Sequence, residues 1–70
     1  MSYNIEKDPV YRIVLESTYL SLATGVGEDM MRMILDIYED EQNFEACAAI
    51  ITAIENWKLA GEPTNVKPIW

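Results

Sequence analysis

The chain has 70 residues, of which 12 are acidic and 5 are Lys or Arg, so its formal net charge is −7. A chain this short makes one domain and buries only about 60% of its unfolded surface, which leaves a monomer marginally stable. It has no His and a single Cys, Cys47, which excludes an intramolecular disulfide and the usual zinc site. We therefore expect that self-association or a partner protein supports the fold.

The first helix is predicted over residues 9–23. Asp8 is a good N-cap, and Pro9 suits the first helical position because its missing N–H is not needed there. Gly25 can then end the helix in a left-handed conformation. Residues 1–7 are expected to form a short arm. The helical face that we expect to be buried consists of Tyr11, Val14, Leu15, Thr18 and Leu22.

The second helix is predicted over residues 28–39. Glu28 and Asp29 place negative charge in the first turn, where the helix dipole favours it. On the polar side, Arg32 is expected to pair with Asp36 four residues later. The apolar side has the full amphipathic spacing and consists of Met30, Met33, Ile34, Ile37 and Tyr38, widened by Met31 and Leu35.

The third helix is predicted over residues 44–60, and either Asp40 or Asn43 can cap it. Its many alanines favour a helix and allow a neighbouring helix to approach closely. Gly61 and Pro63 end it. Its apolar line consists of Cys47, Ile50, Ile54 and Trp57.

Residues 62–70 are predicted to form an extended tail, because Pro63 and Pro68 favour extended backbone. The tail ends in Ile69 and Trp70, two large apolar side chains that are unfavourable in water. Either the tail folds back onto the helices, or it docks into a partner or a second copy, since Trp is favoured at the centre of protein interfaces. The sequence leaves both alternatives open.

These elements predict an all-α protein, with a helical domain over residues 1–61 followed by the tail. The short connections favour antiparallel neighbours, so the second and third helices are expected to form a hairpin. The first helix either packs across that hairpin, which completes a small three-helix bundle, or helps to bind a second chain.

The residue types that catalysis and metal binding need are scarce. Cys47 lies on the apolar line of the third helix, where burial raises the pKa of a thiol and makes it inert. The hydroxyl groups of the first helix have no basic partner. The acidic run that starts at Asp36 resembles a calcium loop but has Glu41 where such a loop requires Gly. We therefore expect no enzymatic activity, no cofactor and no metal.

Hydropathy and charge limit the cellular location and the partners. No apolar run approaches the roughly 18–20 residues of a membrane-spanning helix. The start of the chain lacks the basic and apolar regions of a signal peptide, and a lone thiol is typical of the cytoplasm. An acidic chain is poorly suited to bind nucleic acid or anionic lipid directly. We expect a cytoplasmic protein whose partners are proteins.

The sequence is interpreted as that of a small acidic protein-interaction module, expected to be homo-oligomeric, that binds and modulates or inhibits a partner. One alternative is a nucleic-acid mimic, because residues 25–45 carry seven acidic residues and one Arg. Another is a small-ligand binder at a subunit interface. Methionine is common on adaptable binding surfaces. The candidate partner-binding residues are Asp29, Met30, Met31, Met33, Asp36, Glu39, Asp40, Ile69 and Trp70.

Overall fold

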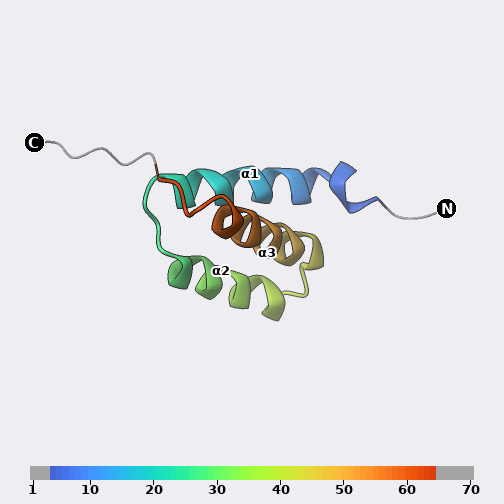
Figure 1. Ribbon diagram of the computed structural model, residues 1–70. Coiled ribbons are helices and arrows are strands. Elements are labelled where there is room, and N and C mark those ends of the chain that lie inside the picture. Colours follow the sequence, from blue (N-terminus) through green and yellow to red (C-terminus); the bar gives the residue numbers. More distant parts are fainter. Residues whose placement is uncertain (1–3, 65–70) are drawn as a thin grey trace, which may run out of the picture.

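The computed structural model describes residues 4–64, and within them the protein is all-helical (Figure 1). The all-α prediction is confirmed, and each helix agrees with its predicted bounds to within one residue. A short 3-10 turn precedes the first helix, in the segment that was expected to be an arm. The elements are η1 (Ile5–Lys7), α1 (Pro9–Ala23), α2 (Glu28–Asp40) and α3 (Phe44–Leu59).

The start and end of α1 follow from the residues that flank it. The Asp8 carboxylate accepts hydrogen bonds from the N–H groups of Val10 and Tyr11, at 2.9 Å and 3.3 Å. At the other end Gly25 has a φ of 97°, and the N–H of Val26 donates to the carbonyl of Ser21 at 2.9 Å. Both are standard ways of satisfying the backbone groups that a helix end leaves free. The predicted N-cap and the predicted C-terminal glycine of α1 are therefore confirmed.

The turn between α2 and α3 was only partly predicted. Asn43, one of the two candidate caps, accepts a hydrogen bond from the N–H of Ala46 at 3.3 Å. Gln42, two residues after the end of α2, has a φ of 59°, in the left-handed region that normally favours glycine. This conformation lets the N–H of Asn43 donate to the carbonyl of Tyr38 at 2.9 Å, so the hydrogen bond offsets the strain at Gln42.

The central helix is α3, which lies between α1 and α2 and packs against both (Figure 1). Ala46, Ala49 and Ala53 have no exposed surface and recur at a spacing of three or four residues, so they form one small-residue stripe. Asn56 continues this stripe by a further turn and donates to the hydroxyl of Tyr19 in α1 at 2.8 Å. The stripe therefore faces α1, and its small side chains allow the close approach that the sequence predicted.

On its other side α3 is joined to α2 by an ion pair. The Glu28 carboxylate forms ion pairs with Lys58 Nζ of α3 at 2.8 Å and with Arg32 Nε of its own helix at 2.7 Å. The predicted pair between Arg32 and Asp36 is therefore wrong. In a helix, a glutamate four residues before a cation is the better-oriented partner, and Glu28 is also held in place by Lys58.

The helices α1 and α2 make few contacts with each other, because α3 lies between them. The main core is formed where α3 meets its neighbours and consists of Leu22, Met31, Leu35, Cys47, Ile50 and Ile54. On one side of the molecule α3 does not fill the space between α1 and α2, and this space is open to solvent.

Candidate docking groove

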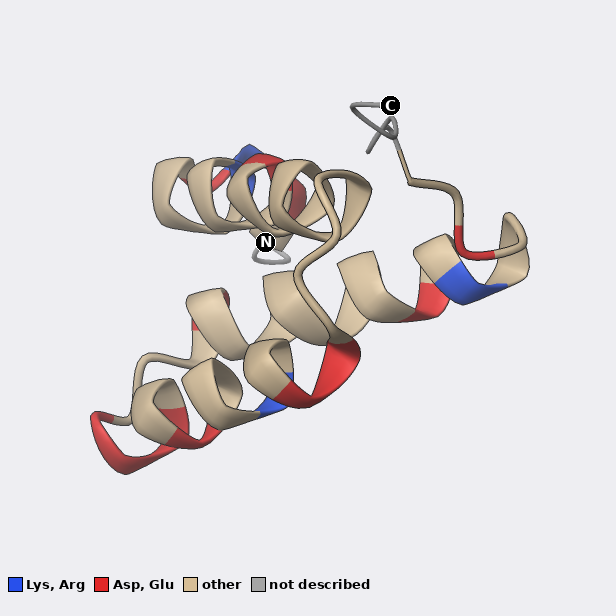
Figure 2. Ribbon diagram, turned by 90° about the vertical axis from the view of Figure 1, so that its left-hand side faces the viewer, with Lys and Arg blue, Asp and Glu red and all other residues tan. Residues whose placement is uncertain are grey.

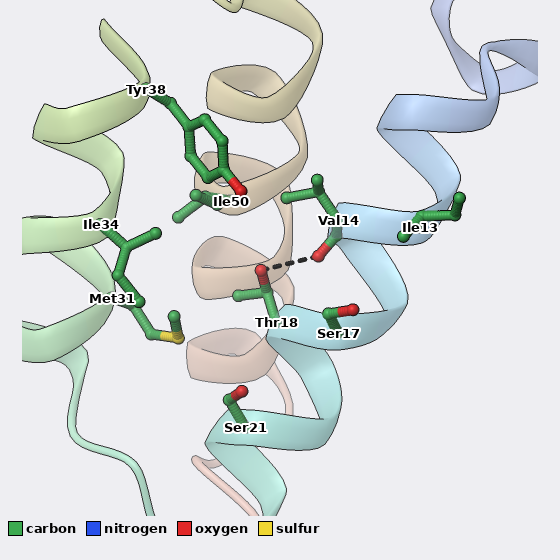
Figure 3. A pocket seen from close by; sticks show the side chains of 9 residues that line it. All are labelled: Ile13, Val14, Ser17, Thr18, Ser21, Met31, Ile34, Tyr38 and Ile50. Carbon is green, nitrogen blue, oxygen red and sulfur yellow. Dashed lines mark hydrogen bonds between the residues drawn. The ribbon is translucent and has the colours of Figure 1, made fainter. Parts of the chain in front are cut away.

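The open space between α1 and α2 is a groove with a cavity volume of about 250 Å³. Figure 3 shows α1 and α2 as its two walls and Ile50 of α3 at its floor. A groove between helices with α3 as its floor suits an elongated occupant such as a helix. The lining residues are Ile13, Val14, Ser17, Thr18 and Ser21 from α1, Met31, Ile34 and Tyr38 from α2, and Ile50.

The lining of the groove is apolar, with small hydroxyl residues along one wall. None of the nine lining residues carries a charge. Thr18 is 3% exposed, and its hydroxyl donates to the carbonyl of Val14 at 2.7 Å, drawn as the dashed line in Figure 3. Because this buried hydroxyl already donates a hydrogen bond within its own helix, it does not need a hydrogen-bond acceptor from whatever occupies the groove.

The α1 rim of the groove carries exposed apolar side chains. Ile13, which lines the groove, is 65% exposed. Leu20 is 66% exposed and follows Ile13 by seven residues, so both lie on the same side of the helix. Val10 is 43% exposed and precedes the groove-lining Ser17 by seven residues. These three side chains extend the apolar surface outward from the groove wall.

The α2 rim of the groove also carries exposed apolar side chains. Met30 and Ile37 lie four residues before and three residues after Ile34, which lines the groove, and they are 51% and 58% exposed. Met33 is next to this line and is 61% exposed. We call the nine lining residues and the rim residues together the groove face. The rim residues are Ile13, which also lines the groove, and Val10, Leu20, Met30, Met33 and Ile37.

The acidic residues of α2 lie away from the groove lining, although some of them adjoin the outer edge of the α2 rim. Asp36 follows the groove-lining Ile34 by two residues, which is roughly 200° around the helix. Figure 2 shows Asp and Glu gathered along α2 and the turn after it. The four acidic residues that the sequence nominated, Asp29, Asp36, Glu39 and Asp40, are all exposed. These four residues form an acidic face of α2 that is separated from the groove lining but adjoins the rim, since Asp36 follows Met33 by three residues and Asp40 follows Ile37 by three.

The predicted binding methionines have different positions. Met30 and Met33 lie on the exposed rim, whereas Met31 is 4% exposed and belongs to the core as well as to the groove wall. Ile69 and Trp70, the other two apolar residues that the sequence nominated, lie outside the described residues.

Sequence reasoning missed the α1 half of the groove face. Val10, Ile13 and Leu20 are apolar, but they fall outside the buried face that begins at Tyr11 and ends at Leu22. Apolar residues beyond the face that a helix needs for its own core were the signal of a second apolar surface.

Two ionisable groups of the described region have shifted pKa values. Burial, followed by the nearby Glu39 carboxylate, raises the pKa of the Cys47 thiol, as the sequence predicted for a cysteine on the apolar line of α3. Hydrogen bonds from Lys58 and then from Arg32 lower the pKa of the Glu28 carboxyl. Both groups take part in packing α3 against α2, and neither lines the groove.

Within residues 4–64, no three His, Cys, Asp or Glu side chains are grouped so that they could hold a metal ion. In the same part of the chain, no helix has the length and apolar character that crossing a membrane requires. Comparison with protein-family models, with curated proteins and with solved structures gives no match for this chain. The groove face and the acidic face are the surface features of the described residues from which a function can be inferred.

Proposed function

We propose that this chain is a small protein-interaction module, and that it binds an apolar helix of a protein through its groove face. The observation that carries the proposal is an uncharged groove whose two rims, on α1 and α2, expose six aliphatic side chains by 43% to 66%. Scattered exposed aliphatic residues are ordinary on a protein surface, whereas aliphatic residues gathered along both edges of an uncharged hollow are typical of a binding site.

The size and shape of the groove favour a helix over a small molecule. Sites for small organic ligands usually have volumes of about 300–1,000 Å³ and enclose most of the ligand. This groove has a volume of about 250 Å³ and lies open between two helices. The tyrosines of residues 4–64, which could stack on a flat ligand, are not gathered in the groove: Tyr38 lines it, whereas Tyr11 is buried and the Tyr19 hydroxyl accepts a hydrogen bond from Asn56. An elongated apolar occupant suits this arrangement better.

A second candidate function is nucleic-acid mimicry by the acidic face. It is supported by the position of Asp29, Asp36 and Asp40, which are exposed on the side of α2 away from the groove. The one cation of this helix, Arg32, is paired with Glu28 and so does not neutralise them. Such a face would attract a basic protein, and that attraction weakens as salt screens it.

The two functions are distinguished by capturing partners from a cell lysate with four tagged forms of the full chain, at low and at high salt. Ile37→Lys alters the groove face, and Leu59→Lys is its matched control because Leu59 is 85% exposed at the end of α3. Asp36→Asn/Asp40→Asn alters the acidic face.

A groove partner is retained at high salt, is lost with Ile37→Lys, and is kept by the control and by the acidic-face variant. A partner that is lost with Asp36→Asn/Asp40→Asn and at high salt, yet kept by Ile37→Lys, supports mimicry instead. If every captured protein is indifferent to both changes, the groove-face proposal and the mimicry proposal are both wrong.

A further inference from the structure

We infer that the helix received by the groove is α2 of a second copy of this chain, so that two copies form a symmetric dimer through their groove faces. This inference rests on the proposed function and names the partner. Each copy would place the rim formed by Met30, Met33 and Ile37 in the groove of the other.

The groove face is complementary to itself. Met30, Met33 and Ile37 have the spacing i, i+3 and i+7, which is the pattern by which a helix anchors in an apolar groove. All three are more than half exposed, so they project from the molecule. A two-fold interface requires one surface to hold both the projecting and the receiving parts, and the groove face holds both.

Charge favours this face over the others for contact between two copies. Each copy carries a net charge of −7, so two copies repel each other, and the repulsion is smallest where the surfaces that meet are uncharged. The groove lining has no charged residue, but exposed acids flank both rims, because residues three or four apart are neighbours on a helix surface. Asp29 and Asp36 flank Met33 on α2, and Glu16 lies between Ile13 and Leu20 on α1. The exposed apolar side chains of α3, Phe44, Ile51 and Leu59, are likewise interspersed with Glu45, Glu55 and Lys58. What distinguishes the groove face is its hollow, which is lined only by uncharged residues.

The apolar area is of the order that a dimer needs. At roughly 60–120 Å² for a fully exposed aliphatic side chain, the six rim residues present on the order of 300 Å². The partly exposed groove residues Val14, Ile34 and Tyr38 add to this. A standard interface buries about 800 Å² per partner, of which somewhat more than half is apolar. The groove face therefore supplies most of the apolar surface that one side of such an interface requires.

The first test is the mass of the full-length chain in solution, measured by sedimentation equilibrium over a range of concentrations. The wild type is expected to move from 8.0 kDa towards twice that value as its concentration rises. Added salt should strengthen the dimer, because it screens the repulsion between two acidic chains. Ile37→Lys should raise the dimer dissociation constant by roughly 100-fold, since it buries an unpaired charge twice in a symmetric interface. Leu59→Lys changes the net charge equally and should alter it by less than about threefold.

A mixing experiment tests which helices meet. Ile13→Lys and Ile37→Glu should each weaken the homodimer, because each change then occurs in both halves of the interface. If α2 of one copy lies against α1 of the other, a mixture of the two variants places both changes in one half and leaves the other half native. The mixture should therefore dimerise at a concentration where neither variant does so alone. Far-UV circular dichroism of each variant confirms that it is folded.

Several results would overturn the inference. They are a folded wild type that stays at 8.0 kDa at every concentration, equal weakening by Ile37→Lys and Leu59→Lys, or no recovery on mixing. A wild-type monomer that dimerises only after Ile69→Ser/Trp70→Ser would assign the groove to the chain's own tail instead. A monomer whose lysate partner is lost with Ile37→Lys would refute the dimer but leave the proposed function standing. A monomer without such a partner would refute both.

Discussion

Two isoleucines of α3, only three residues apart, should differ sharply when each is replaced by alanine. Ile54 is 2% exposed and belongs to the core cluster that joins α3 to its neighbours, whereas Ile51 is 41% exposed and lies outside that cluster. The change removes the same atoms from the same helix, so the difference between the two variants isolates burial. Neither residue lines the groove.

The magnitudes follow from the atoms removed. Ile→Ala deletes three carbons, worth about 0.8 kcal/mol each when fully buried, and the cavity at an enclosed site adds about 1 kcal/mol or more. At either position the higher helix propensity of alanine offsets a few tenths of a kcal/mol of this loss. Ile54→Ala should therefore cost about 3 kcal/mol. Ile51→Ala should cost about 1 kcal/mol, because part of its side chain is already in water and no closed cavity forms.

The assay is urea unfolding followed by far-UV circular dichroism, at one low protein concentration for all three proteins. A core of this size rarely supplies more than about 3–5 kcal/mol in total, so Ile54→Ala should be partly unfolded even without urea. Ile51→Ala should unfold cooperatively with an unchanged denaturant slope. Equal losses for the two variants, or a larger loss for Ile51→Ala, would show that α3 does not pack as described.

Three further changes test the turns and the ionisable groups. Gly25→Ala should cost about 1 kcal/mol or more in unfolding free energy because Gly25 has a φ of 97°, whereas Gly27→Ala should be nearly neutral, since its φ is −70° and nothing lies within 4 Å of an added Cβ. The lowered pKa of Glu28 means that its contribution to stability is present above its ordinary value of 4.5 and is lost as the pH falls through the lower value in the folded state. In Lys58→Gln an NMR titration should show the Glu28 pKa moving back up, and an unchanged pKa would remove Lys58 as the cause. Cys47 should resist a thiol reagent in the native protein and react once urea unfolds it; fast native reaction would contradict its burial.

The helices and most of their ends were determined by local sequence. Caps such as Asp8 and Asn43, and glycines such as Gly25, act on backbone groups only a few residues away, so their effect can be predicted without knowing the rest of the fold. The amphipathic spacing identified the apolar side of α2 but not the part of it that is buried. The structure buries Met31 and Leu35, at the edge of the predicted stripe, and leaves Met30, Met33 and Ile37 in its centre more than half exposed. The burial of Cys47 followed from the same kind of periodicity.

The tertiary structure alone decided which apolar residues remain uncovered. Ile13 and Leu20 are as apolar as Leu22, but only the position of α3 between α1 and α2 leaves the first two exposed and the third buried. It also selected Glu28 over Asp36 as the partner of Arg32, because Lys58 approaches from α3. Periodicity describes one helix at a time, whereas a groove exists only where two helices are held apart by a third.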